Sequence, residues 1–221
     1  SPFVKKVLLT HQSSKKNFPG KKAVVVGLPL KKSLLRKTPK LKFTPKLLYI
    51  TCGKQGSHII NSCLFPLIPQ LVKKYTVVHQ TGANTKTQDI SKARRIKNSL
   101  GKYSKRYIHA PYFFASEASN YLKSAHLVIS RAGAHTTYEL CLLGKRVIFI
   151  PIPWVSHNEQ FLNAKLAAKS TTSLVLQEKE LNPKVMMSAI KALDKQKLKP
   201  TSKTLITNAT QRILKIINEI I

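Results

Sequence analysis

The sequence predicts an α/β fold, a doubly wound, Rossmann-like parallel sheet with helices on both faces. Short β-branched apolar runs lack the polar alternation of half-exposed strands, as expected for parallel strands buried on both faces. These runs alternate with segments of helical pattern along most of the chain. With 221 residues, of which 43% are hydrophobic, the chain can also bury a substantial core.

The first 46 residues differ from the remainder of the chain. Apolar runs predict short strands over 7–10 and 23–26, and Gly27-Leu28-Pro29 closes the second. Residues 31–46 are basic, carry two prolines and show no sustained periodicity, so we expect an interdomain linker there. Regular alternation of strands and helices begins at residue 47, where we expect the main domain to start and continue to residue 221.

Six strands and seven helices are predicted from residue 47 onward. The apolar runs predict strands over 47–51, 76–80, 106–110, 126–130, 146–150 and 173–176. Helical patterns predict helices over 55–73, 89–100, 115–123, 136–143, 158–169, 183–193 and 203–220. Pro66 and Pro69 loosen the first of these helices.

The charge balance is extreme, with 39 Lys and Arg against 8 Asp and Glu, a formal net charge of +31. Such a charge attracts phosphates, whether on nucleic acid, anionic lipid or nucleotide; alternatively, the scattered lysines are simply solvated. The chain has no basic stripe with interleaved aromatics, zinc finger or RNP motif, so we expect no nucleic-acid partner.

Three cysteines without CxxC spacing argue against a disulfide framework and for a reducing compartment.

Two further features concern the ends and the membrane. No apolar run reaches the roughly 20 residues that a membrane-spanning helix needs. The chain begins Ser1-Pro2-Phe3, which is neither an initiator methionine nor a signal peptide, so we expect a fragment that starts inside a larger protein.

Residues 130–163 carry most of the candidate site. The small residues around Gly133 allow the backbone to approach a ligand, and we expect Thr136 and Thr137 to cap the following helix. Glu139 lies on the first turns of that helix. A glycine turn at the carboxyl end of a strand, backed by helix amides, suits an anion such as a diphosphate.

Other loops also follow predicted strands, where ligands of such sheets bind. Cys52-Gly53-Lys54-Gln55-Gly56-Ser57 is a glycine loop that opens a helix, but it lacks the Lys-Ser/Thr of a P-loop. Its amides suit a phosphate, with an ordinary strand–helix turn as the alternative. His79 after the second strand fits a structural histidine, and the aromatics at 112–114 fit core packing or contact with a base.

The chain offers little for acid–base or metal chemistry. Its two aspartates, Asp89 and Asp194, are far apart, and no His or carboxylate cluster has metal spacing, so we expect no metal and no cofactor. No serine sits in a G-x-S-x-G elbow, and no carboxylate pair suggests hydrolysis. What remains is amides, lysines, Glu139, and the pair Glu159-Gln160, which can grip sugar hydroxyls. These groups suit binding of a nucleotide-sugar.

Taken together, these segments resemble the carboxyl-terminal half of the MurG-type glycosyltransferases. The resemblance is carried by SRAGAHTTYE, FIPIP and HNEQFLNA, by GKQGSHIIN and HQTG, and by VVVGLPLKK. It runs in order from about residue 7 to residue 168. Members of this family transfer N-acetylglucosamine from UDP-N-acetylglucosamine to a lipid-linked muramoyl-pentapeptide in peptidoglycan synthesis.

The resemblance implies a GT-B fold, of which this chain is the carboxyl-terminal, donor-binding half. Residues 1–30 would end the acceptor domain and form the hinge, residues 47–221 would bind the donor, and the helix over 203–220 would pack back on the amino-terminal domain. Glu139 would bind the ribose and Phe114 and Ala115 would flank the uracil. Arg131 is a further implied UDP-sugar ligand. The remaining ones are Gly53, Lys54, Gln55, Gly56, Gly133, Ala134, His135 and Thr136 near the diphosphate, and Glu159, Gln160 and Asn163 at the sugar.

The sequence departs from the family pattern at several of these positions. Cys52 replaces Gly, Lys54 replaces Ser, and Glu159 replaces Gln, which leaves the donor sugar open. Leu28 replaces Asn in the hinge, and Lys31 replaces an Arg that contacts phosphate, so the bidentate contact becomes a point charge.

By resemblance the reaction is inverting and independent of metal, with a general base from the absent half and an inactive isolated fragment. The enzyme would act at the cytoplasmic face of the membrane, as a peripheral protein on anionic lipid. Alternatives are another UDP-sugar transferase, a donor-binding subunit with a membrane-bound partner, a sugar-nucleotide 2-epimerase and a nucleic-acid binder.

Overall fold

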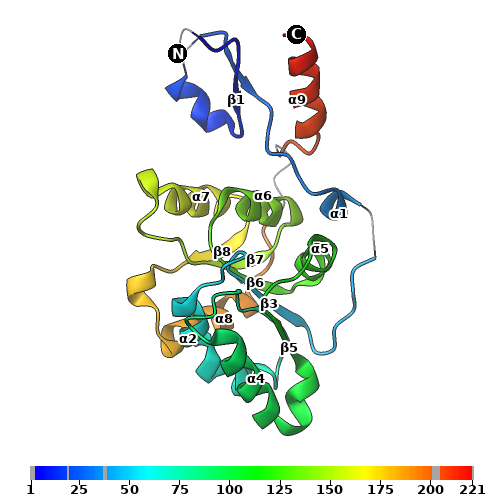
Figure 1. Cartoon of the computed structure of the whole chain (residues 1–221), viewed down its shortest axis with the longest axis vertical. Helices are drawn as coiled ribbons and strands as arrows, with labels where there is room; N and C mark the ends of the chain where they lie inside the picture. The colour runs from blue at the N-terminus through cyan, green and yellow to red at the C-terminus, as the bar shows by residue number, and fades with distance from the viewer. Residues whose placement is uncertain (1–2, 19, 37–38, 201–204, 221) are drawn as a thin grey trace. The chain divides into compact units, whose positions relative to one another are not determined.

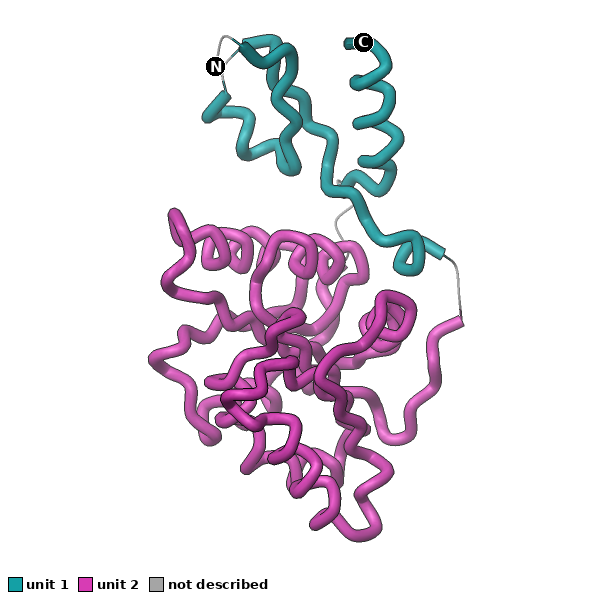
Figure 2. Tube along the Cα trace, in the orientation of Figure 1, with its two compact units in different colours: residues 1–36, 202–221 teal, residues 37–201 magenta. Residues whose placement is uncertain are grey.

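The computed structural model describes residues 3–18, 20–36, 39–200 and 205–220. The chain divides into a unit formed by residues 1–36 with 202–221 and a second unit formed by residues 37–201 (Figure 2). Two residues of the expected linker, 37 and 38, and two of the helix expected over 203–220, 203 and 204, lie outside the described residues.

A sheet of six parallel strands forms the centre of the second unit. The strand order is β5-β4-β3-β6-β7-β8, so the order reverses between β3 and β6. The strands are β3 Leu47–Thr51, β4 Thr76–Gln80, β5 Tyr107–Ala110, β6 Leu127–Ser130, β7 Arg146–Phe149 and β8 Thr172–Val175. Each lies within one residue of its predicted bounds, because the apolar runs coincide with the buried strands.

Helices cover both faces of this sheet, as a doubly wound fold requires (Figure 1). One face carries α2 His58–Leu64, η2 Phe65–Leu67, α3 Ile68–Leu71, α4 Asp89–Ser99 and α8 Pro183–Lys195. The other carries α5 Ala115–Ser124, α6 Ala134–Leu143 and α7 Glu159–Ala167. Short 3-10 turns complete the connections: η3 Gly101–Arg106, η4 Ser156–Asn158 and η5 Glu178–Glu180.

Three helix predictions were wrong in detail. The helix expected over 203–220 is α9 Ala209–Asn218, and the described residues 205–208 before it are not helical. The single helix expected over 55–73 is three short segments that begin at His58, since Pro66 and Pro69 lack the amide hydrogens that a continuous helix needs. Helix α6 begins at Ala134 with Gly133 as its N-cap and no side-chain cap. Thr136 and Thr137 therefore lie inside the helix and do not cap it.

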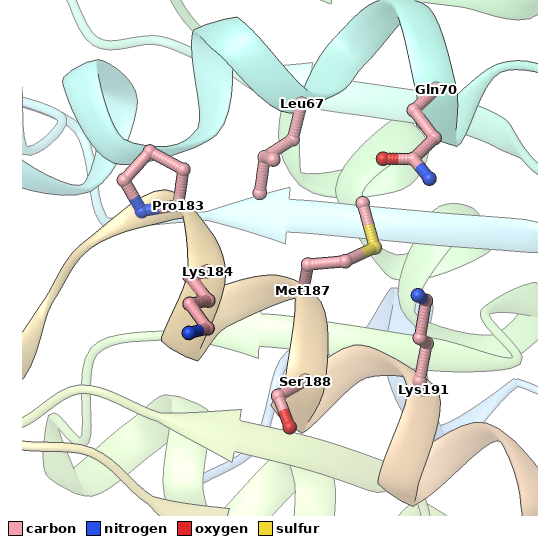
Figure 3. Close-up of a pocket in the computed structure, with 7 residues that line it drawn as sticks. All are labelled: Leu67, Gln70, Pro183, Lys184, Met187, Ser188 and Lys191. Atoms are coloured by element: carbon pink, nitrogen blue, oxygen red, sulfur yellow. The ribbon is translucent and has the colours of Figure 1, made fainter.

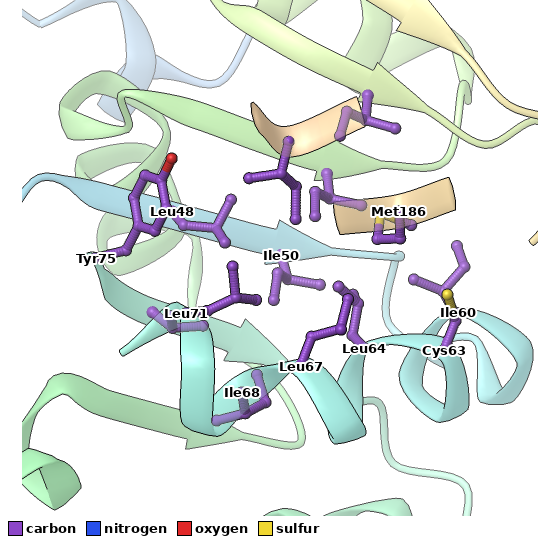
Figure 4. Close-up of a cluster of buried hydrophobic side chains, with 14 of the residues drawn as sticks. Leu48, Ile50, Ile60, Cys63, Leu64, Leu67, Ile68, Leu71, Tyr75 and Met186 are labelled. Carbon is purple, nitrogen blue, oxygen red and sulfur yellow. The ribbon is translucent and has the colours of Figure 1, made fainter. Parts of the chain in front are cut away.

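The main hydrophobic core lies between the sheet and the helices α2, α3 and α8 (Figure 4). Leu48 and Ile50 of β3 point into it and are fully buried against Leu64 and Ile68. Tyr49, between them on the strand, faces the opposite side and packs against Tyr121 of α5, with ring centroids 5.8 Å apart. Both faces of β3 are thus covered, which explains its continuous apolar sequence.

Polar and charged side chains connect the amino-terminal ends of three strands in the same sheet to helix α8. The Oδ1 atom of Asp194, on α8, lies 2.6 Å from Lys46 Nζ and 2.8 Å from His126 Nε2. Burial alone would raise the pKa of Asp194, but hydrogen bonds from Lys46, Tyr75 and His126 together lower it. Because these partners precede β3, β4 and β6, one carboxylate ties three strand beginnings to α8.

The first unit is built on two short parallel strands. β1 Val7–Leu9 pairs with β2 Ala23–Val25, with Val7 opposite Ala23. The loop between them contains four lysines and the turn η1 Gln12–Asn17. The unit also holds α1 Lys32–Leu35 and α9 Ala209–Asn218, and Lys5 Nζ donates to the Ile220 carbonyl at 2.9 Å.

A shallow depression of about 380 Å³ lies over α3 and α8 (Figure 3). Its lining residues are Leu67, Gln70, Pro183, Lys184, Met187, Ser188 and Lys191. Among the helices of the described residues, none is long and apolar enough to cross a membrane.

Candidate functional site

The predicted site residues of the second unit gather at the carboxyl edge of the sheet, around the reversal between β3 and β6. In open α/β sheets this reversal leaves a crevice in which ligands bind. The loop after β3 holds Gly53–Gly56, and the turn after β6 holds Gly133. Lys31 belongs to the first unit, where it is the N-cap of α1.

The glycine loop after β3 is held by direct contact between main chains. Gly56 has a φ of 74°, and a Cβ atom there would lie 2.1 Å from the Thr81 carbonyl oxygen. A Cβ on Gly82 would lie 2.2 Å from the Gln55 carbonyl oxygen, so the two turns interlock. Gly53, Lys54 and Gln55 are exposed on this loop. The interlocked turns thus present an exposed, positively charged loop above β3.

The turn after β6 has a different geometry. Gly133 has a φ of −64°, which any residue adopts, and a Cβ there would meet no atom within 4 Å. The first helical bond of α6 runs from the Thr137 amide to the Gly133 carbonyl at 2.9 Å. The amides of Ala134, His135 and Thr136 precede this bond and lie at the helix end, where amides characteristically bind anions.

Arg131 was predicted to be a UDP-sugar ligand. In the structure its guanidinium contacts other groups of the protein. It donates to Ser57 Oγ at 2.7 Å and to the Ile150 carbonyl at 3.1 Å, and forms an ion pair with Glu178. Both charged side chains are nearly buried, with 11% and 7% exposed. Arg131 therefore joins the loops after β3, β6, β7 and β8.

Gln160 and Asn163, on α7, also hold main chain. Gln160 Oε1 accepts from the amides of Ala132 at 3.2 Å and Ile152 at 3.1 Å. Asn163 Nδ2 donates to the Ala132 carbonyl at 3.2 Å. Their side chains fix the peptide that precedes Gly133, while Glu159 is exposed at the start of the same helix.

Glu139 lies one turn into α6 and is buried, with 6% of its surface exposed. The turn that holds it also carries Thr136, which is partly exposed. The expected contact of Glu139 with the ribose stays a prediction.

The aromatic segment after β5 divides into buried and exposed side chains. Phe113 is buried and packs on Tyr121, with centroids 5.0 Å apart, so core packing applies to this residue. Phe114 is 72% exposed and meets Tyr112 edge-on at 5.7 Å. Ala115, the first residue of α5, is exposed beside Phe114. Exposed aromatic surface at this edge can face a base.

A buried polar chain behind these loops was not predicted from the sequence. Asn61 Nδ2 donates to the Thr81 carbonyl and to Asp89 Oδ2, both at 2.8 Å. Its Oδ1 must then accept from His79 Nε2 at 2.9 Å, which leaves His79 Nδ1 to accept from the Tyr107 hydroxyl at 3.0 Å. Burial lowers the pKa of His79 to about 3, so this histidine is neutral. The motif HQTG marked the position, but its partners lie in other loops.

Metal ligands do not gather at this edge. Within the described ranges, no group of three or more His, Cys, Asp or Glu side chains could hold a metal ion. The three cysteines are free and buried, and burial raises the pKa of Cys52 to about 12.

The strand order that reverses between β3 and β6, with helices on both faces, defines a Rossmann-like domain whose ligand site lies at the carboxyl edge of the sheet. The chain belongs to the glycosyltransferase family 28 C-terminal domain family, whose model matches residues 47–220. This confirms the predicted fold class and the resemblance to MurG-type enzymes.

Named relatives agree with this family. The chain is 32% identical over 230 residues to a UDP-N-acetylglucosamine–N-acetylmuramyl-(pentapeptide) pyrophosphoryl-undecaprenol N-acetylglucosamine transferase of Clostridium perfringens, covering 99% of this chain and 61% of that protein. It thus spans less than two thirds of the length of the curated relatives it matches.

Solved structures share the fold. The crystal structure of MurG from Acinetobacter baumannii matches with a TM-score of 0.67 at 21% identity, over 99% of this chain and 62% of that one. The glycotransferase of kitacinnamycin matches with a TM-score of 0.63 at 13% identity, over 97% of this chain and 54% of that one.

Proposed function

We propose that this chain supplies the donor-binding half of a glycosyltransferase that moves N-acetylglucosamine from UDP-N-acetylglucosamine to a lipid-linked muramoyl-pentapeptide in peptidoglycan synthesis. The observation that carries the proposal is the open space at Gly133. Neither its φ of −64° nor any neighbouring atom within 4 Å requires glycine there. A ligand that approaches the helix end closely would require it.

A diphosphate fits this space for two reasons. The amides at the start of α6 lie at the positive end of the helix dipole, which stabilises anions. Across the β3–β6 reversal, the loop after β3 exposes Lys54. Charge of the leaving UDP would be stabilised by these amides and by lysine rather than by a metal.

The remaining groups suit the other parts of the donor. Glu139 would accept from the ribose hydroxyls, and the exposed ring of Phe114, with Ala115, would flank the uracil. Glu159 would face the sugar hydroxyls, together with Gln160 and Asn163. Since the Oε1 atom of Gln160 already accepts from two amides, its amide nitrogen is the group with which it would bind the sugar.

In the proposed reaction, the C4 hydroxyl oxygen of the muramoyl sugar attacks C1 of N-acetylglucosamine. The new C–O bond forms as the bond between C1 and the UDP oxygen breaks, which inverts the anomeric centre. The general base would come from outside this chain, so we expect the isolated chain to bind donor and transfer nothing.

A lipid-linked acceptor would place this reaction at the cytoplasmic face of the membrane. The formal charge of +31 favours peripheral attachment to anionic lipid. Binding to vesicles should therefore rise with their content of anionic lipid; binding that is indifferent to it would contradict the attachment.

Calorimetry of the chain with UDP, UDP-N-acetylglucosamine and UDP-glucose tests donor binding. The wild type should bind UDP. Glu139→Ala should lower the affinity for UDP about tenfold or more, as expected for the loss of a charged hydrogen bond. Glu219→Ala, at an exposed carboxylate of the first unit, is the control. Unchanged affinity in a folded Glu139→Ala variant would show that the ribose assignment is wrong.

A further inference from the structure

The side chain of Gln80 joins two loops at the carboxyl edge of the sheet. Gln80 is the last residue of β4 and is 4% exposed. Its Nε2 donates to the Gly53 carbonyl at 2.7 Å, and its Oε1 accepts from the Phe113 amide at 3.4 Å. One side chain therefore spans from the glycine loop after β3 to the aromatic segment after β5.

This bridge depends on the chemistry of the carboxamide. The Gly53 carbonyl can only accept and the Phe113 amide can only donate, so their positions determine which way the Gln80 amide is turned. A glutamine carries one donor group and one acceptor at the required reach. A methionine has a similar length but neither group, and an asparagine has both groups on a side chain one methylene shorter.

The two loops that Gln80 joins face opposite ends of the proposed donor. The loop at Gly53 would lie at the diphosphate, and Phe114, next to Phe113, would lie at the uracil. Phe113 is anchored in the core by Tyr121, so its amide and the start of α5 move together. We infer that Gln80 is a positioning residue that sets the spacing between the phosphate-binding loop and the base-binding segment, an inference that rests on the proposed function.

The turn that follows Gln80 has other attachments. Asn61 holds the Thr81 carbonyl at 2.8 Å. Gly56 and Gly82 bring their two turns into main-chain contact. Substitution of Gln80 therefore removes the bridge while these contacts keep the β4 turn in place, which separates positioning from folding.

The test compares the whole donor nucleotide with its parts. Nuclear magnetic resonance titrations measure the affinities of the wild type, Gln80→Met and Gln80→Asn for UDP, uridine and pyrophosphate. Gln70→Met, at an exposed position on α3, is the matched control. UDP should bind about tenfold more weakly to both Gln80 variants, the loss expected when hydrogen bonds of this kind disappear.

The affinities for uridine and for pyrophosphate should each change less than about threefold, since each fragment needs only one of the two loops. An equal loss for UDP and for both fragments, or unchanged UDP affinity, would overturn the inference while leaving the proposed function in place. A wild type that does not bind UDP would instead contradict the proposed function. If thermal unfolding shows that both Gln80 variants are unfolded while Gln70→Met is folded, Gln80 is structural and the inference is wrong.

Discussion

Two turns at the carboxyl edge of the sheet both contain glycine, but for different reasons. At Gly56, after β3, a Cβ would lie 2.1 Å from the Thr81 carbonyl oxygen, so the fold itself requires glycine. At Gly133, after β6, a Cβ would meet nothing within 4 Å. The fold therefore does not require glycine at position 133. We attribute this glycine to a ligand that approaches the backbone closely, the proposed diphosphate.

The two turns also differ in how the protein holds them. At Gly56, main-chain contact with the β4 turn holds the loop after β3, and Gly53 of this loop is also held by the Gln80 side chain. Side chains hold the turn after β6, because Arg131, Gln160 and Asn163 bind the main chain around it. Substitutions should therefore affect the two turns in different ways.

The largest loss of stability is expected from Arg131→Leu, which leaves Glu178 buried without its cation. Breaking such a pair costs about 3–5 kcal/mol of the free energy of unfolding, measured by urea unfolding. Adding Glu178→Leu should restore much of this loss, because no buried charge then remains. The exposed pair of Lys215 and Glu219, 3.9 Å apart, is the control: Lys215→Ala should cost about 0.5 kcal/mol or less. A similarly small loss for Arg131→Leu would mean that side chains do not hold the β6 turn.

Gly56→Ala should cost roughly 3 kcal/mol, since the added methyl group meets backbone and the residue must keep a positive φ. Gly53→Ala is the matched control, because Gly53 has a φ of 79° and a Cβ there would meet no atom within 4 Å. It should cost only about 1 kcal/mol. Equal losses in chemical unfolding would show that the main-chain contact does not matter.

Strand β4 should make stability depend on pH through its buried residue His79. Burial lowers the pKa of His79 to about 3, whereas an unfolded histidine titrates near 6.5, so the unfolded chain takes up the proton first as the pH falls. Stability is therefore lost below about pH 6.5, by about 2 kcal/mol between pH 7 and 5 for this group. His79→Gln should lack this part of the pH dependence in unfolding measurements at both pH values, and His157→Gln, at an exposed histidine, should retain it.

The smallest change in stability is expected from Gly133→Ala, less than about 1 kcal/mol, the cost of alanine at a helix N-cap. Its affinity for UDP should nevertheless fall about tenfold or more, because the methyl group occupies the space proposed for the diphosphate. Calorimetry with UDP and thermal unfolding of the same sample separate the two effects. A stable variant with unchanged affinity would remove the contrast between the two turns.

Local patterns were sufficient for much of the fold. The strands were predicted to within one residue, because both faces of the sheet are covered and most of the strands are largely apolar. The helix over 55–73 and the start of α6 were predicted less well. Proline interrupts the first, and a turn of small residues at 132–134 gives no signal for where helical geometry begins.

The site was predicted from the sequence as a set of loops, without the contacts between them. Because the loops that follow parallel strands lie at one edge of the sheet, the motifs placed Gly133, Glu139 and the glycine loop there. The roles of Gln160 and Asn163 as clamps on the Ala132 peptide were not predicted, since their bonds join residues about 30 positions apart.

By itself, the sequence determined the fold class, the strands and the family. Burial of the strands imposes apolar runs that reveal the fold class, and the loops after the strands carry sequence motifs that members of the family share. Only the tertiary structure decided which glycine serves the fold and which leaves space for a ligand. It also decided which polar side chains hold other loops, as Gln80 and Arg131 do. Those distinctions depend on atoms brought together from distant positions in the chain, and no local pattern of residues encodes such distances.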